Sequence, residues 1–140
     1  MAKYLNKFEF SEHFPGLTCA YGSANATLVA VLDRLFYSTP FDKTMKVGCS
    51  VAVARRGGLT ATWDELNKYF GISGMPIASG QYWNGLHGAR PGEATQDGEG
   101  LQQMRTLARN MAFLMRGIAL AREAFGLPDK EQRVSTNFVR

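Results

Sequence analysis

Apolar residues recur at intervals of three and four along much of the chain, a spacing typical of helices that bury one face. The first such segment predicts a helix over about 24–36, with four apolar side chains on one face: Leu28, Val31, Leu32 and Leu35. Ser23 or Asn25 is placed to cap its first turn, because short polar side chains accept hydrogen bonds from the free N–H groups there. A second helix is expected over 62–70, where Thr62 and Glu65 have the spacing of a capping box.

The longest periodic segment predicts a third helix over about 97–125. Its apolar stripe consists of seven residues at helical spacing: Met104, Leu107, Met111, Leu114, Ile118, Ala121 and Phe125. Leu101, Ala108 and Met115 widen this stripe to more than one sheet face needs, so we expect a homodimer or homotetramer that buries them. Three arginines line the opposite side, where a solvated face is the simplest interpretation: Arg105, Arg109 and Arg116.

Two short apolar segments between these helices predict strands. Residues 46–54 are rich in valine and carry no charge after Lys46, as in a strand that is buried on both faces of a parallel sheet. Residues 75–79 form a second apolar run, and the glycine-rich segment 80–96 is expected to be a loop. Strands that alternate with helices predict an α/β domain whose two strands are parallel neighbours.

Composition limits the classes of protein to consider. A chain of 140 residues with 45% hydrophobic and 20% charged residues is one globular domain. A net charge of +4 is compatible with an anionic small molecule, a nucleotide or RNA. Two cysteines and two histidines, widely spaced, predict neither a disulfide framework nor a metal site. We expect a cytoplasmic protein without a membrane partner, because no run approaches the ~20 apolar residues of a membrane span.

Two polar segments are candidates for ligand binding, because ligands of parallel sheets sit at the carboxyl ends of strands. Small and hydroxyl residues open the first helix, so its backbone N–H groups could face an anion, although an ordinary helix cap is the alternative. Arginines and glycines follow the valine-rich strand and could hold a flat ligand, although a glycine turn with solvated arginines is equally compatible. The candidate cofactor-binding residues are Tyr21, Gly22, Ser23, Asn25, Arg55, Arg56, Gly57 and Gly58. Neither segment has the spacing of a Walker A or a dinucleotide-binding glycine motif.

A third candidate is the aromatic loop with Tyr82, Trp83 and His87, which could cover a planar cofactor or simply pack over the core. His87 has no acidic or cysteine partner nearby in the sequence, so a nucleophilic triad is not supported. We name no catalytic residue.

Nine short motifs, in order, resemble the flavodoxin-like NAD(P)H-dependent FMN reductase family: residues 21–28, 32–38, 54–58, 66–70, 75–77, 82–84, 104–107, 109–114 and 136–140. The resemblance implies a flavodoxin-like, three-layer parallel sheet, bound FMN, electrons from NAD(P)H and a homodimer or homotetramer. It places the flavin ring between the segment 21–25 and the turn 55–58. It also implies a domain over 21–140 that is truncated at its N-terminus, because residues 1–20 form an atypical arm without the family's phosphate loop.

Three functions remain open from the sequence. The first is an FMN-dependent NAD(P)H oxidoreductase, impaired by the missing phosphate loop. The second is a non-catalytic remnant or assembly subunit of the same fold that lacks tight FMN binding. A basic RNA-binding module is a third and weaker interpretation, and we expect no nucleic-acid partner.

Overall fold

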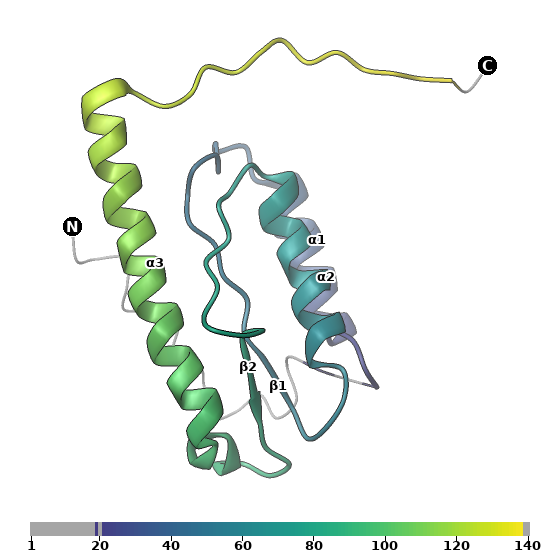
Figure 1. Cartoon of the computed structure of the whole chain (residues 1–140). Helices are drawn as coiled ribbons and strands as arrows, with labels where there is room; N and C mark the ends of the chain where they lie inside the picture. The colour runs from purple at the N-terminus through teal and green to yellow at the C-terminus, as the bar shows by residue number, and fades with distance from the viewer. Residues whose placement is uncertain (1–18, 20, 139–140) are drawn as a thin grey trace.

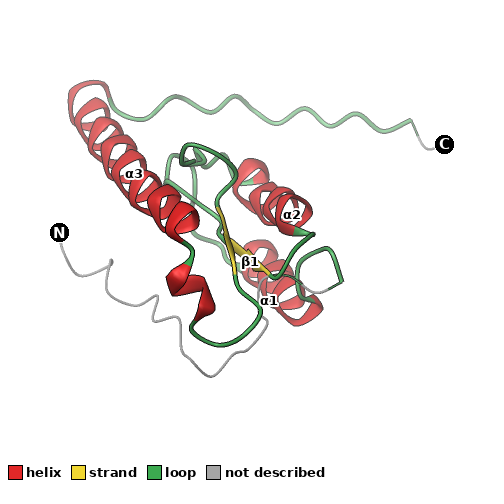
Figure 2. Ribbon diagram, turned by 60° about the horizontal axis from the view of Figure 1, so that its bottom comes forward, coloured by secondary structure: helices red, strands yellow, loops and turns green. Residues whose placement is uncertain are grey.

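The computed structural model describes residue 19 and residues 21–138 (Figure 1). The expected arm over 1–20 therefore lies outside the described residues, apart from Cys19. The chain forms, in order, α1 (Ala26–Ser38), β1 (Ala52–Ala54), α2 (Leu59–Ile72), β2 (Gly85–His87), the 3₁₀ helix η1 (Glu93–Gln96) and α3 (Gly98–Phe125). Figures 1 and 2 show α1 and α2 on one side of the strands and α3 on the other. The protein is thus an α/β domain, as the alternating pattern predicted.

The strands are parallel neighbours, as predicted, and α2 connects them. β1 pairs with β2 in the register Ala52 to Gly85 and Ala54 to His87. Further upstream, a parallel bridge joins Gly48 to Ile77. The predicted strands 46–54 and 75–79 are therefore present only in part, and the segment expected to be a loop supplies β2. The ladder is interrupted because residues 79–83 leave the strand path between the two pairings.

Asn84 closes this interruption from inside the protein, where its side chain is completely buried. Its Nδ2 donates to the carbonyls of Ser50, at 3.1 Å, and of Ala78, at 3.3 Å. Its Oδ1 accepts from the N–H of Gly80 at 2.9 Å. One carboxamide thus replaces the backbone bonds that the strands cannot make to each other at this point.

The observed ends of the helices differ from the predicted ones at α2. Of the two caps predicted for α1, Ser23 and Asn25, the structure has Asn25. Its Oδ1 accepts a hydrogen bond from the N–H of Thr27. The capping box at Thr62 is wrong, because α2 begins three residues earlier and Thr62 is a buried residue inside it. Gly58 is the N-cap instead, with a φ of 93° that only glycine adopts easily.

The apolar stripe of α3 is covered only at its beginning. Leu107 is buried, and Met111 and Leu114 are half-buried. Further along, Met115 and Phe125 are 42% and 89% exposed, in a helix that in Figure 1 extends well beyond the strands. The helices of the described part of the chain do not combine the length and apolar character that crossing a membrane requires.

Asp97 fixes the start of α3 to the sheet. Its carboxylate accepts from the N–H of Gly100, at 2.9 Å, as the N-cap of α3. It also accepts from the N–H of His87, at 2.7 Å, at the end of β2. These backbone bonds, the one from Gly100 first, lower the pKa of the Asp97 carboxyl.

We expect Asn84→Ala to destabilise the protein by about 3 kcal/mol or more, because it removes three hydrogen bonds and two of the backbone groups that lose them are buried. Urea denaturation followed by circular dichroism measures this loss. The matched control is Asn110→Ala, which removes one exposed bond to the Ser79 carbonyl and should cost about 1 kcal/mol or less. Equal losses in both variants would show that the buried position of Asn84 has no special role.

The Asp97 carboxylate should make stability depend on pH. Its pKa is lowered in the folded protein, so its contribution is complete above the ordinary value of 3.8 and disappears as the pH falls through the folded pKa. We expect Asp97→Asn to lose about 1 kcal/mol at pH 7 and to approach the wild type as the pH falls through the folded pKa, since protonated aspartic acid resembles asparagine. Denaturation curves over a series of pH values from neutral to acid test this, with Asp129→Asn in the exposed C-terminal segment as the control. A gap that stays constant with pH would contradict it.

Candidate functional site

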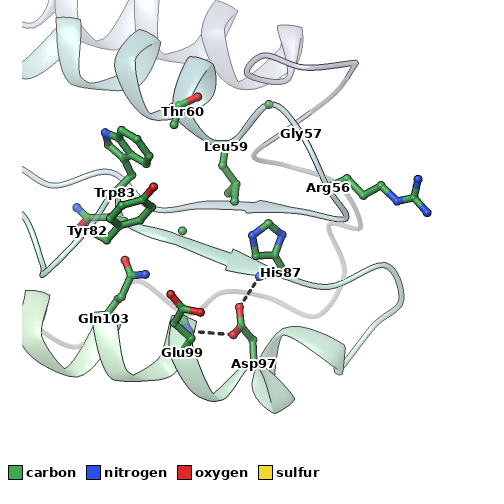
Figure 3. Close-up of a pocket in the computed structure, with 14 residues that line it drawn as sticks. Arg56, Gly57, Leu59, Thr60, Tyr82, Trp83, His87, Asp97, Glu99 and Gln103 are labelled. Carbon is green, nitrogen blue, oxygen red and sulfur yellow. Dashed lines mark hydrogen bonds between the residues drawn. The ribbon is translucent and has the colours of Figure 1, made fainter.

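A pocket of about 280 Å³ lies beside β2, between the start of α2 and the start of α3 (Figure 3). Three parts of the chain that are distant in sequence line it: residues 56–60, residues 82–87 and the first turns of α3. Its volume is at the lower end of the ~300–1,000 Å³ range of small-molecule sites. The size suits a ring system or one end of a larger ligand.

The turn 55–58 forms one wall of this pocket. Arg56, Gly57 and Gly58 line it, whereas Arg55 is exposed and does not. In Figure 3 the Arg56 side chain extends away from the pocket, so its backbone and not its guanidinium faces the space. A Cβ at Gly57 would meet no atom within 4 Å, which leaves this side of the turn open to a flat ligand.

The segment 21–25 packs against the turn and does not line the pocket. A Cβ at Gly58 would lie 2.5 Å from the Sγ of Cys19 and 2.6 Å from the Cα of Gly22. Contact this close leaves no room for a ring between Gly22 and Gly58. Tyr21, with a φ of 50°, projects fully into solvent.

The polar groups of the segment 21–25 are engaged within the protein. The Ser23 hydroxyl and the Ala24 N–H both donate to one oxygen of Glu65 on α2, the latter at 3.1 Å. These two bonds, that of Ser23 first, lower the pKa of the Glu65 carboxyl. With Asn25 bonded to the N–H of Thr27, one N–H group in the first turn of α1 and the Ala24 N–H just before it are occupied.

The aromatic loop forms the opposite wall. The rings of Tyr82 and Trp83 meet edge to face, with centroids 4.3 Å apart, and both side chains remain about half exposed. Figure 3 shows them at the mouth of the pocket, across from Leu59 and beside Gln103. An exposed aromatic pair at a pocket mouth offers a surface for stacking a planar ligand.

The two helices that begin at the pocket differ in electrostatic character. The N-terminus of α3 is occupied by Asp97, whose carboxylate accepts from Gly100 and His87. No side chain caps the N-terminus of α2, and its first residues, Leu59 and Thr60, line the pocket. The α2 end therefore presents a partial positive charge, suited to an electron-rich edge of a ligand.

Gln103 is a pocket residue that the sequence analysis missed. Its side chain comes from the buried face of α3, is 8% exposed and points into the pocket (Figure 3). Its Oε1 is shielded from solvent and has no hydrogen-bond partner. A signal existed, because Gln103 falls in register with Gly100 and Leu107 on the face that α3 buries, where a polar residue is unusual.

Other features of the described residues carry less chemistry. These residues contain no group of three or more metal-ligating side chains. A second, more open pocket of about 420 Å³ lies against α2, next to Trp63, Lys68 and Ile77. It is the larger of the two, but none of the sequence-predicted binding residues lines it. The pocket beside β2 is therefore the candidate site.

Comparison with known proteins found no relative of this chain. The chain matches no family model, no curated protein and no solved structure.

Proposed function

We propose that this protein is a flavodoxin-like, FMN-dependent NAD(P)H oxidoreductase whose flavin ring enters the pocket beside β2. The observation that carries the proposal is that residues 56–58 of the turn meet Tyr82 and Trp83 around one pocket. In the sequence these were separate candidates for contact with a planar cofactor. The parallel strands, with helices on both sides, support the flavodoxin-like arrangement.

The residues present suit the ring of FMN. Tyr82 and Trp83 provide a surface for stacking, and Gly57 lets the backbone approach the ring. The uncapped start of α2 faces the pocket and would stabilise negative charge on the pyrimidine side of the reduced ring. FMN, when bound, supplies the redox chemistry between NAD(P)H and an acceptor, so the protein needs to bind and orient and requires no acid or base of its own.

The residues around the pocket provide few cations or N–H donors for the phosphate of FMN. Arg56 is the one lysine or arginine among the described residues that line the pocket, and its side chain points away from it. The N-terminal turns of α1 and α3 are each partly engaged by a capping side chain, Asn25 and Asp97. We therefore propose that the ring contributes most of the affinity and that FMN binds in the micromolar range.

The alternative function is an assembly subunit of this fold without tight FMN binding. Apolar side chains that are exposed to solvent favour this alternative. Among them are Val31 and Leu35 on α1 and Phe113 and Leu120 on α3. Exposed apolar surface of this kind is typical of interaction sites. A homodimer or homotetramer would cover it under either function.

Flavin binding distinguishes the two functions. Titrating FMN or riboflavin with the protein, followed by flavin fluorescence, should give micromolar dissociation constants within about tenfold of each other, because the phosphate has few partners. Replacing Arg55 and Arg56 together by alanine should weaken FMN binding by about twofold at most, through lost long-range attraction, because neither guanidinium faces the pocket. The matched control replaces Arg105 and Arg109, exposed on α3, and should change little. Nanomolar affinity, or a loss of about tenfold or more in the Arg55 and Arg56 variant, would show that the phosphate has strong partners and would contradict the proposed site.

Self-association should depend on α3. We expect the protein to form dimers or tetramers at micromolar concentration in multi-angle light scattering. Met115→Glu places a charge on the predicted contact face, where Met115 is 42% exposed, and should shift the protein towards monomer. Arg116→Glu, next to it in sequence and also exposed, is the control and should leave the mass unchanged. A wild-type protein that is monomeric would overturn the proposed association.

A further inference from the structure

Gln103 has hydrogen-bonding capacity that the protein does not use. Its Oε1 is buried and unpartnered at the pocket wall, although buried polar groups are almost always bonded. An unsatisfied buried acceptor costs roughly 1–3 kcal/mol. A nonpolar residue would fit the buried face of α3 without this cost.

The surroundings of Gln103 limit which ligand could satisfy it. Figure 3 places its carboxamide below Tyr82, on the α3 side of the pocket, with Leu59 and α2 across the space. The backbone of α3 is held close to the aromatic loop here, because a Cβ at Gly80 would lie 3.0 Å from the Gln103 carbonyl oxygen. Because Gln103 lies beside Tyr82 in Figure 3, a ring stacked on Tyr82 would present an edge to its carboxamide.

We propose that Gln103 recognises a planar ligand by an edge that carries an N–H donor beside a carbonyl, as in a cyclic imide or a primary carboxamide. A carboxamide pairs with such an edge through two hydrogen bonds, because each partner presents one donor and one acceptor. This inference rests on the proposed function, in which the flavin pyrimidine ring supplies a cyclic imide and the nicotinamide of NAD(P)H supplies a carboxamide. Of the two, the flavin imide is the occupant that we assign to this position.

A flavin that is methylated at the imide nitrogen tests this assignment with the wild-type protein alone. 3-Methyl-FMN keeps the ring and the phosphate but lacks the N–H. We expect the wild-type protein to bind FMN about tenfold more tightly than 3-methyl-FMN, because one hydrogen bond and the pairing of a buried group are lost. Equal affinity for the two flavins would overturn the assignment to the flavin imide.

Gln103→Met tests the residue itself, because methionine has a similar length and no hydrogen-bonding group of comparable strength. It should weaken FMN binding about tenfold and bind both flavins equally. Gln102→Met, on the exposed side of the same turn, is the control and should retain the discrimination. The thermal midpoint of apo Gln103→Met should equal or exceed that of the wild type, since the change removes an unsatisfied group. A variant that is less stable yet still discriminates between the flavins would show a structural role only and overturn the proposal.

A second set of binding measurements, with NADPH, tests whether Gln103 recognises the nicotinamide instead of the flavin. If the wild type binds both flavins equally but Gln103→Met weakens NADPH binding about tenfold, the recognised edge is a carboxamide and the general proposal stands. If neither ligand responds to Gln103→Met, the proposal is wrong while the proposed function survives. If the wild type binds no flavin at all, the proposed function fails and this inference fails with it.

Discussion

The structure depends on one buried carboxamide, that of Asn84. The two parallel strands would form a continuous ladder if residues 79–83 did not leave the strand path. Asn84 allows this departure because its side chain bonds to Ser50, Ala78 and Gly80 at the point where the regular ladder between the strands is interrupted. The network continues to α2, because the Ser50 hydroxyl donates to Asn67 at 2.7 Å. Within this network Asn84 makes three hydrogen bonds, whereas the Asn67 Nδ2 is buried and has no hydrogen-bond partner.

The pocket is a consequence of the same interruption. Tyr82 and Trp83 lie in the segment that leaves the strand path, and Asn84 fixes where that segment returns. β2 then ends at His87, whose N–H bonds to Asp97 and thereby sets the position of α3. The aromatic wall, the edge of β2 and Gln103 are thus placed by two side chains, Asn84 and Asp97. Rigid placement of this kind keeps ligand-binding groups in position without a ligand.

Some polar groups around the pocket have hydrogen-bond partners within the protein and others do not. This difference determines which kind of ligand the pocket suits. Glu65 and Asp97 engage N–H groups at the starts of α1 and α3. The start of α2 and the Gln103 carboxamide remain for a ligand. An electron-rich, hydrogen-bonding ring suits this combination better than a free phosphate, which requires several donors or cations together.

The sequence by itself determined the α/β class, the three helices and the parallel pairing, because helical periodicity and a buried valine-rich run are local signals. It also indicated the turn 55–58 and the aromatic pair as separate candidates. Only the tertiary structure decided that these meet, that β2 lies within an apparent loop, and that α2 starts at a left-handed glycine packed against Gly22. The physical reason is that these features depend on contacts between residues far apart in the chain. Gln103 shows this most clearly, since its missing partner is visible only once the residues around it are in place.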